Sequence, residues 1–95
     1  MFVILLKFGA GKARAGEFMD GHKAWIQKGF DDGVFLLVGS LTPNMGGGLL
    51  ASGESRADIE ARVGQDPFVA EGIVEAEILE IDPARTDDRL SFLNA

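Results

Sequence analysis

The chain has 95 residues, of which 46% are hydrophobic and 25% charged, and this balance predicts one folded domain rather than a disordered chain. Its net charge of −6, which no local cluster of Lys and Arg offsets, disfavours binding to nucleic acid. The absence of cysteine excludes disulfides and thiolate metal sites, and it fits a cytoplasmic location.

The first half of the chain predicts a strand, a helix and a hairpin. Residues 2–8 form an apolar strand that is too short to span a membrane and lacks the basic start of a signal peptide, so we expect no membrane partner. Residues 14–30 repeat apolar side chains at helical spacing, and Gly33 follows as a helix-ending residue. Segments 34–41 and 49–51 are strands joined by a stretch typical of turns.

The second half predicts a helix, a short helical turn and a last strand. Ser55 and Asp58 have the spacing of a capping box, and Asp66 before Pro67 is typical of a second helix start. The last strand covers 74–81. The resulting order is that of an α+β, ferredoxin-like βαββαβ sandwich with a four-stranded antiparallel sheet.

We expect residues 1–83 to form this domain and residues 84–95 to form a C-terminal arm. Both faces of the predicted strands are apolar, although two helices cover only one face of such a sheet. On the second strand we expect one face with Val34, Leu36 and Val38 and an opposite face with Phe35 and Leu37. An apolar face of that size needs a cover, which predicts a homodimer through the sheet face. The alternative is that the C-terminal arm covers it within one chain.

Residues 9–16 are rich in glycine and connect the first strand to the first helix. They lack the spacing of a dinucleotide fingerprint or a P-loop, so we expect no cofactor there. Lys12 and Arg14 would present positive charge to an anionic ligand at the start of the helix.

His22 is the chain's one histidine and lies near the centre of the apolar stripe of the first helix. Two interpretations are open: a structural histidine bonded to a backbone carbonyl, or a general acid/base. A metal site is not expected, because one histidine with scattered carboxylates does not supply the usual zinc ligands. Asp66 is expected to cap a helix, and its second oxygen is free to hold an imidazole N–H. Ser40 completes a Ser-His-Asp set by residue type, which only geometry can establish.

Several short motifs share an order and a spacing with one known family. They are the apolar first strand, His22, Asp32-Gly33-Val34-Phe35, Gly39, Gly46-Gly47, and Asp66-Pro67-Phe68 followed by Gly72. Over residues 1–83 the chain therefore resembles the YciI-like (YCII-related) domain family. The resemblance implies a dimeric α/β barrel in which His22 and Asp66 face one pocket, and we expect Trp25, Gly39 and Phe68 to line it. Many members have Gly-Pro where this chain has Gly39-Ser40, which leaves the role of Ser40 open.

Three hypotheses about function follow. The first is a small enzyme without a cofactor, resembling lyases, isomerases or dehydrochlorinases, in which His22 moves a proton on a small cyclic or carbonyl substrate and Asp66 fixes its tautomer. Ser40 is a third catalytic candidate. The second is a metabolite-binding or regulatory dimer that uses the same pocket without chemistry. The third, a purely structural dimer, predicts no pocket between the sheet and the first helix; assembly beyond the dimer is open.

Overall fold

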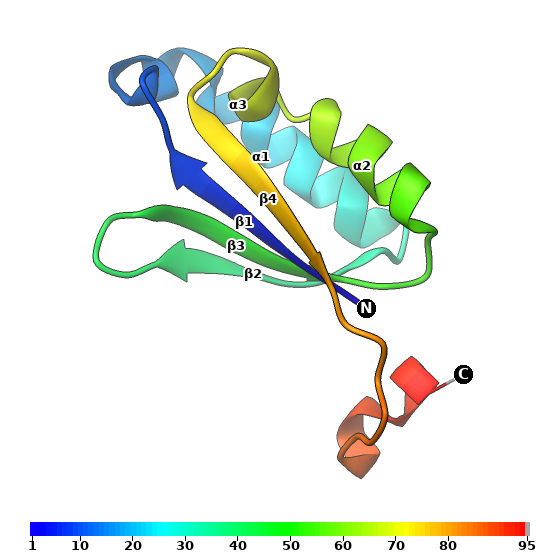
Figure 1. Ribbon diagram of the computed structural model, residues 1–95. Helices are drawn as coiled ribbons and strands as arrows, with labels where there is room; N and C mark the ends of the chain where they lie inside the picture. The colour runs from blue at the N-terminus through cyan, green and yellow to red at the C-terminus, as the bar shows by residue number, and fades with distance from the viewer. Residues whose placement is uncertain (95) are drawn as a thin grey trace.

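The fold consists of one antiparallel sheet with helices on one of its faces, as Figure 1 shows for the computed structural model, which describes residues 1–94. The strand order is β2-β3-β1-β4. The strands are β1 (Phe2–Phe8), β2 (Phe35–Leu41), β3 (Gly46–Ala51) and β4 (Val74–Glu80), and the helices are α1 (Ala15–Asp31), α2 (Arg56–Gly64) and α3 (Pro67–Ala70). Short 3-10 helices occupy Lys12–Arg14 (η1) and Asp88–Asn94 (η2). The order of strands and helices confirms the predicted ferredoxin-like α+β fold.

The helices begin and end where local chemistry requires. The Ser55 hydroxyl accepts a hydrogen bond from the Asp58 backbone N–H at 3.2 Å, and the Asp66 carboxylate accepts one from the Phe68 N–H at 3.0 Å. Both side chains therefore satisfy N–H groups that have no partner inside the helix, as predicted. Gly33 follows α1 with φ of 73°, a conformation that is costly for residues with a Cβ.

The hydrophobic core lies between the sheet and the helices. We call the sheet face that packs against α1–α3 the helix face, and its opposite the open face. Directly paired residues of the four strands form rows across the helix face, and one such row is Val38, Leu49, Ile4 and Ile78. Ile4 and Leu49 of this row belong to one buried cluster with the fully buried Ile59 of α2, and Ile78 packs against that cluster. Val38, on the edge strand, is 42% exposed.

The second strand differs from the prediction in its side-chain directions. The pairing of β2 with β3 is irregular between Phe35 and Leu37, so one residue is left out of the ladder. Phe35 and Val38 therefore both lie on the helix face and Leu37 on the open face, whereas strict alternation had put Phe35 opposite Val38. The third strand also begins at Gly46 rather than at residue 49, because its glycines pair with β1 despite their turn-like composition.

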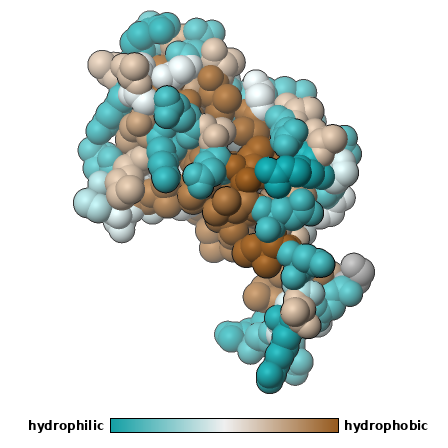
Figure 2. Space-filling view, viewed as in Figure 1, coloured by the Kyte–Doolittle hydropathy of each residue, from teal (hydrophilic) through white to brown (hydrophobic). Residues whose placement is uncertain are grey.

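The open face has exposed apolar side chains. Leu37 is 52% exposed, Leu79 46% and Ile81 48%. The segment after β4 projects away from the body in Figure 1, so within the single chain the arm does not cover this face. Figure 2 shows hydrophobic residues in brown, from the middle of the view down to the neck where this segment leaves. Ala95, the last residue of the predicted arm, lies outside the described residues.

No helix within residues 1–94 combines the length and the apolar character needed to cross a membrane.

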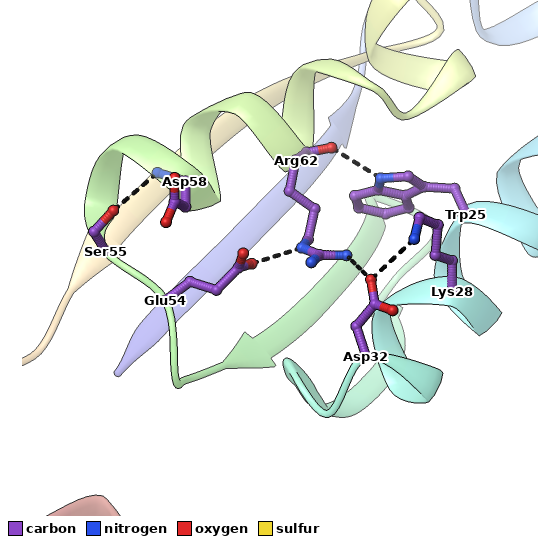
Figure 3. A network of polar contacts seen from close by, with 7 residues as sticks. All are labelled: Trp25, Lys28, Asp32, Glu54, Ser55, Asp58 and Arg62. Atoms are coloured by element: carbon purple, nitrogen blue, oxygen red, sulfur yellow. Dashed lines mark hydrogen bonds and ion pairs between the residues drawn. The ribbon is translucent and has the colours of Figure 1, made fainter.

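A polar network joins α1 to α2 (Figure 3). The Arg62 guanidinium donates to Glu54 at 2.7 Å and to Asp32 at 3.0 Å, and Lys28 donates to Asp32 at 3.1 Å. The Trp25 indole N–H donates to the Arg62 carbonyl at 2.9 Å. The hydrogen bond from Arg62, and then that from Lys28, lowers the pKa of Asp32 below its ordinary value of 3.8. These contacts fix the orientation of α1, the helix that carries His22.

Candidate functional site

A cavity of about 310 Å³ lies between the helix face and α1. Met19, His22 and Ile26 of α1 form its roof, and Phe68 of α3 forms one wall. Because these three α1 residues are spaced by three and four positions, they lie on one side of the helix. The third hypothesis predicted no pocket in this position, and the cavity counts against it.

The cavity has its origin in the size of the side chains below it. Ser40, Gly47, Leu6 and Ala76 are paired in one row across the helix face, adjacent to the row of large side chains described above. Three of these four side chains are smaller than valine, so the row fills less of the space beneath α1. Ser40, Gly47 and Leu6 line the cavity directly. The strand register therefore creates the space, and α1 covers it.

His22 is held in one orientation by its neighbours. Its Nδ1 lies 2.7 Å from Oδ1 of Asp66, and its side chain is 14% exposed, whereas that of Asp66 is fully buried. The Phe68 ring is stacked on the imidazole, with 4.0 Å between the ring centres and 3° between the planes. A carboxylate accepts hydrogen bonds, so Nδ1 is the protonated nitrogen, and Nε2 is left as the acceptor of an imidazole that lines the cavity.

One carboxylate oxygen performs two tasks at Asp66. Oδ1 accepts both from His22 and from the Phe68 backbone N–H, while Oδ2 is buried without a hydrogen-bond partner among the described residues. The N-cap of α3 and the anchor of His22 are therefore the same atom. The two helices also approach closely, since a Cβ on Gly21 would come within 3.1 Å of the Pro67 ring. Glycine at this point permits the contact that brings His22 to Asp66.

Most of the predicted pocket residues lie at the cavity, but Trp25 does not. Gly39 and Ser40 line it from β2, and Phe68 lines it from α3. No hydrogen bond joins Ser40 to His22 within residues 1–94, so the structure shows a His-Asp pair and not a joined Ser-His-Asp set. Trp25 is 7% exposed and packs in the core, with its ring centre 6.0 Å from that of His22.

The two cations near the glycine-rich connection have other neighbours. Lys12 places its ammonium 4.6 Å from the centre of the Phe8 ring, and Arg14 pairs with Glu17 at 3.4 Å while lying over Phe18. Neither Lys12 nor Arg14 lines the cavity. No contact of Lys12 or Arg14 with the cavity therefore supports the expectation that they present positive charge to a ligand.

Sequence patterns alone did not identify several of the lining residues. Met19 and Ile26 belong to the same helical stripe as His22, and that spacing is the signal that would have found them. Gly47 gave no such signal, because only the pairing of β3 with β1 and β2 shows which face it occupies.

The arrangement provides one group that can transfer a proton. Burial of the Asp66 carboxylate against Nδ1 fixes the imidazole tautomer and would stabilise the imidazolium formed when Nε2 takes up a proton. The remaining walls that we have named are apolar or backbone, apart from the Ser40 hydroxyl. The site therefore combines an oriented base with a small, mostly apolar space.

Comparison with known proteins supports the fold. No protein-family model matches the chain, and neither does any curated protein. A solved structure that is similar is 5-chloro-2-hydroxyhydroquinone dehydrochlorinase (TftG) from Burkholderia phenoliruptrix AC1100, in complex with 2,5-dihydroxybenzoquinone. It superimposes with a TM-score of 0.67 at 15% sequence identity, over 85% of this chain and 93% of that chain. At this identity the similarity shows a shared fold, and membership of the YciI-like family stays a prediction.

Proposed function

We propose that this chain is a small enzyme, resembling the YciI-like type, in which His22 transfers a proton on a small cyclic or carbonyl compound. The observation that carries the proposal is the 2.7 Å contact between His22 Nδ1 and Asp66, in an imidazole that also lines the cavity. A structural histidine would need no such cavity beside it. The fold shared with a dehydrochlorinase adds support at the level of architecture.

The chemistry requires no group beyond the substrate and the pair. His22 Nε2 takes a proton from a carbon or hydroxyl next to a carbonyl, and the electron pair stays on the substrate. Return of the proton to another atom gives isomerisation, and loss of a leaving group with its electrons gives elimination. Asp66 holds the imidazolium in place during either step. Ser40, on the β2 side of the cavity, would hydrogen-bond a substrate oxygen.

The test compares wild type with His22→Gln and with Lys23→Gln, a control at an exposed position of the same helix. Chloride release from 5-chloro-2-hydroxyhydroquinone, and solvent deuterium uptake by a panel of small cyclic carbonyl compounds, report proton transfer. We expect His22→Gln to lower the rate by about 10²–10⁴-fold, the usual contribution of a general acid/base, with an unchanged melting temperature. An unfolded variant would support a structural role for His22 instead, and undiminished turnover would exclude its role as the base.

The metabolite-binding hypothesis uses the same cavity without a reaction. Its supporting observation is that Asp66 Oδ1 is already the cap of α3, which gives the contact with His22 a structural reason as well. Recovery of each bound compound unchanged, with no deuterium uptake after long incubation at high protein concentration, would favour this hypothesis over the enzyme.

We also propose that the chain forms a homodimer through its open face. The support is the exposure of Leu37, Leu79 and Ile81 on or beside that face, together with a shallow groove there that Val3, Leu5 and Leu50 help to line. Covering such side chains stabilises the dimer, because each Å² of apolar area removed from water contributes about 25 cal/mol of favourable free energy. Analytical ultracentrifugation should show a dimer that Leu37→Asp dissociates, while Leu90→Asp on the arm, also exposed, leaves it intact. A wild-type monomer at micromolar concentration would contradict the proposal.

A further inference from the structure

Three consecutive glycines, Gly46, Gly47 and Gly48, begin β3, and the backbone requires glycine at one of them. Gly46 has φ of 126°, and a Cβ there would lie 2.0 Å from the Leu6 carbonyl oxygen, so the backbone requires glycine. Gly48 pairs with Leu5 and Gly39 on the open face, where a Cβ would make an ordinary 3.4 Å contact with Leu41.

The backbone does not require glycine at Gly47 either, and Gly47 is the one of the three whose side chain would lie on the helix face. It pairs with Leu6 and Ser40 on the helix face, and a Cβ there would meet only the Gly39 carbonyl oxygen, at the ordinary distance of 3.5 Å. Its φ is not in the left-handed region. Glycine inside a strand costs about 0.5–1 kcal/mol relative to alanine, so a side chain at this position would favour folding. The bare position lies in the cavity wall, opposite α1.

The size of the cavity limits what it can take. Ligand pockets span about 300–1,000 Å³, so a volume of about 310 Å³ is at the lower end. An apolar cavity of about 150 Å³ in another protein holds benzene. The space beneath α1 has about twice that volume, so it fits a small cyclic molecule with its substituents.

The charge of the lining limits it further. None of the lining residues is Asp, Glu, Lys or Arg, and their polar side chains are those of His22 and Ser40. The ammonium of Lys12 lies over the Phe8 ring, and Lys12 itself is exposed. Burial of an ionised group without a partner is strongly unfavourable, which disfavours a carboxylate, phosphate or ammonium inside.

The geometry points to Gly47 as the specificity-determining residue of the cavity, which takes a small, uncharged cyclic molecule lying against the strand at Gly47, between Ser40 and His22. This inference rests on the proposed function in that it concerns the same site. It adds the class of the ligand and the residue that sets its size.

The experiment uses a matched set of probes and variants. The probes are 4-hydroxybenzyl alcohol, 4-hydroxybenzoate and 4-hydroxybenzylamine, which share one ring and differ in charge. Binding is followed by NMR through the imidazole signals of His22, which need no assignment because the chain has one histidine. The proteins are wild type, Gly47→Ala, Gly47→Val and the neighbouring control Gly48→Ala. The backbone of Gly48 borders the cavity, but its methyl group would lie on the open face.

We expect only the uncharged alcohol to shift the His22 signals at low millimolar concentration. Gly47→Val should weaken that binding by more than about tenfold, with Gly47→Ala intermediate and Gly48→Ala near wild type. Gly47→Val should also raise the melting temperature, because it replaces a glycine in a strand and fills empty space.

Equal binding of the alcohol and the benzoate, or wild-type affinity in Gly47→Val, would overturn the inference. So would a lowered melting temperature in both Gly47 variants, which would make this glycine a structural requirement. These outcomes are separate from those for the proposed function. Binding of the alcohol without any turnover would support the inference and contradict the proposed enzymatic function. His22-dependent turnover of a charged compound would support the enzymatic function and contradict the inference.

Discussion

Replacement of Asp66 tests whether one buried oxygen both caps α3 and anchors His22. Asp66→Ala removes the N-cap, which costs about 1 kcal/mol, and leaves the His22 N–H without its partner in a part-buried place, which costs about 1–3 kcal/mol. The free energy of unfolding should therefore fall by about 2–4 kcal/mol. Asp66→Asn keeps an acceptor oxygen for both donors, so its loss should be smaller than that of Asp66→Ala. Its N–H₂ group takes the buried place of Oδ2, where it has no partner, so a loss of about 1–2 kcal/mol is expected.

Thermal and urea unfolding of the three proteins measure these differences. In a domain of this size each kcal/mol shifts the melting temperature by about 4–8 °C, so Asp66→Ala should melt roughly 10–30 °C lower. Turnover should separate from stability, since Asp66→Asn folds but no longer places a negative charge against the imidazolium. The reasoning fails if Asp66→Ala melts within about 2 °C of wild type, because a cap and an anchor would then contribute nothing.

Two further predictions concern the frame around the site. The hydrogen bond from Arg62 and that from Lys28 lower the pKa of Asp32. The ionised Asp32 therefore contributes its full stabilisation above pH 3.8, and this stabilisation is lost as the pH falls through the lower pKa of the folded state. Asp32→Asn should therefore unfold at lower urea concentration than wild type at pH 7 but equally at pH 2, and an equal difference at both pH values would contradict this. Gly29→Ala would place a Cβ 2.1 Å from the buried Phe35 ring, so it should lower the free energy of unfolding by at least about 1–3 kcal/mol, whereas Gly16→Ala on the same helix meets no atom within 4 Å and should leave it unchanged or higher. Urea titrations at constant pH decide the second case, and equal midpoints for the two alanine variants would refute it.

The sequence predicted those parts of the structure that depend on neighbouring residues. The capping box at Ser55 and the Asp66-Pro67 start are local rules, because the side chain satisfies N–H groups two or three residues away. The order of strands and helices followed from period and turn composition. The pairing of His22 with Asp66 came from a family resemblance rather than from spacing, since 44 positions separate them.

The parts that were missed depend on pairing between distant segments. Strict alternation could not reveal the irregularity between Phe35 and Leu37, which arises where β2 meets β3. Trp25 shares the apolar stripe with His22, but it is three positions further on and its indole reaches Arg62 of α2. A stripe on a helix shows which side is buried, and it does not distinguish side chains over a cavity from those over packed core.

The two components of the candidate site thus have different origins in the chain. The oriented imidazole depends on local structure: Pro67 favours the first turn of α3, Asp66 caps it, and the turn brings the Phe68 ring parallel to His22. The empty space depends on strand register, because Ser40 and Gly47 lie side by side only when β2 and β3 pair as they do. A shift of one residue in that pairing would place these small side chains opposite other partners, without changing the His22–Asp66 contact. The base and the cavity can therefore be altered separately, and this independence makes variants at Gly47 and at Asp66 complementary tests of one site.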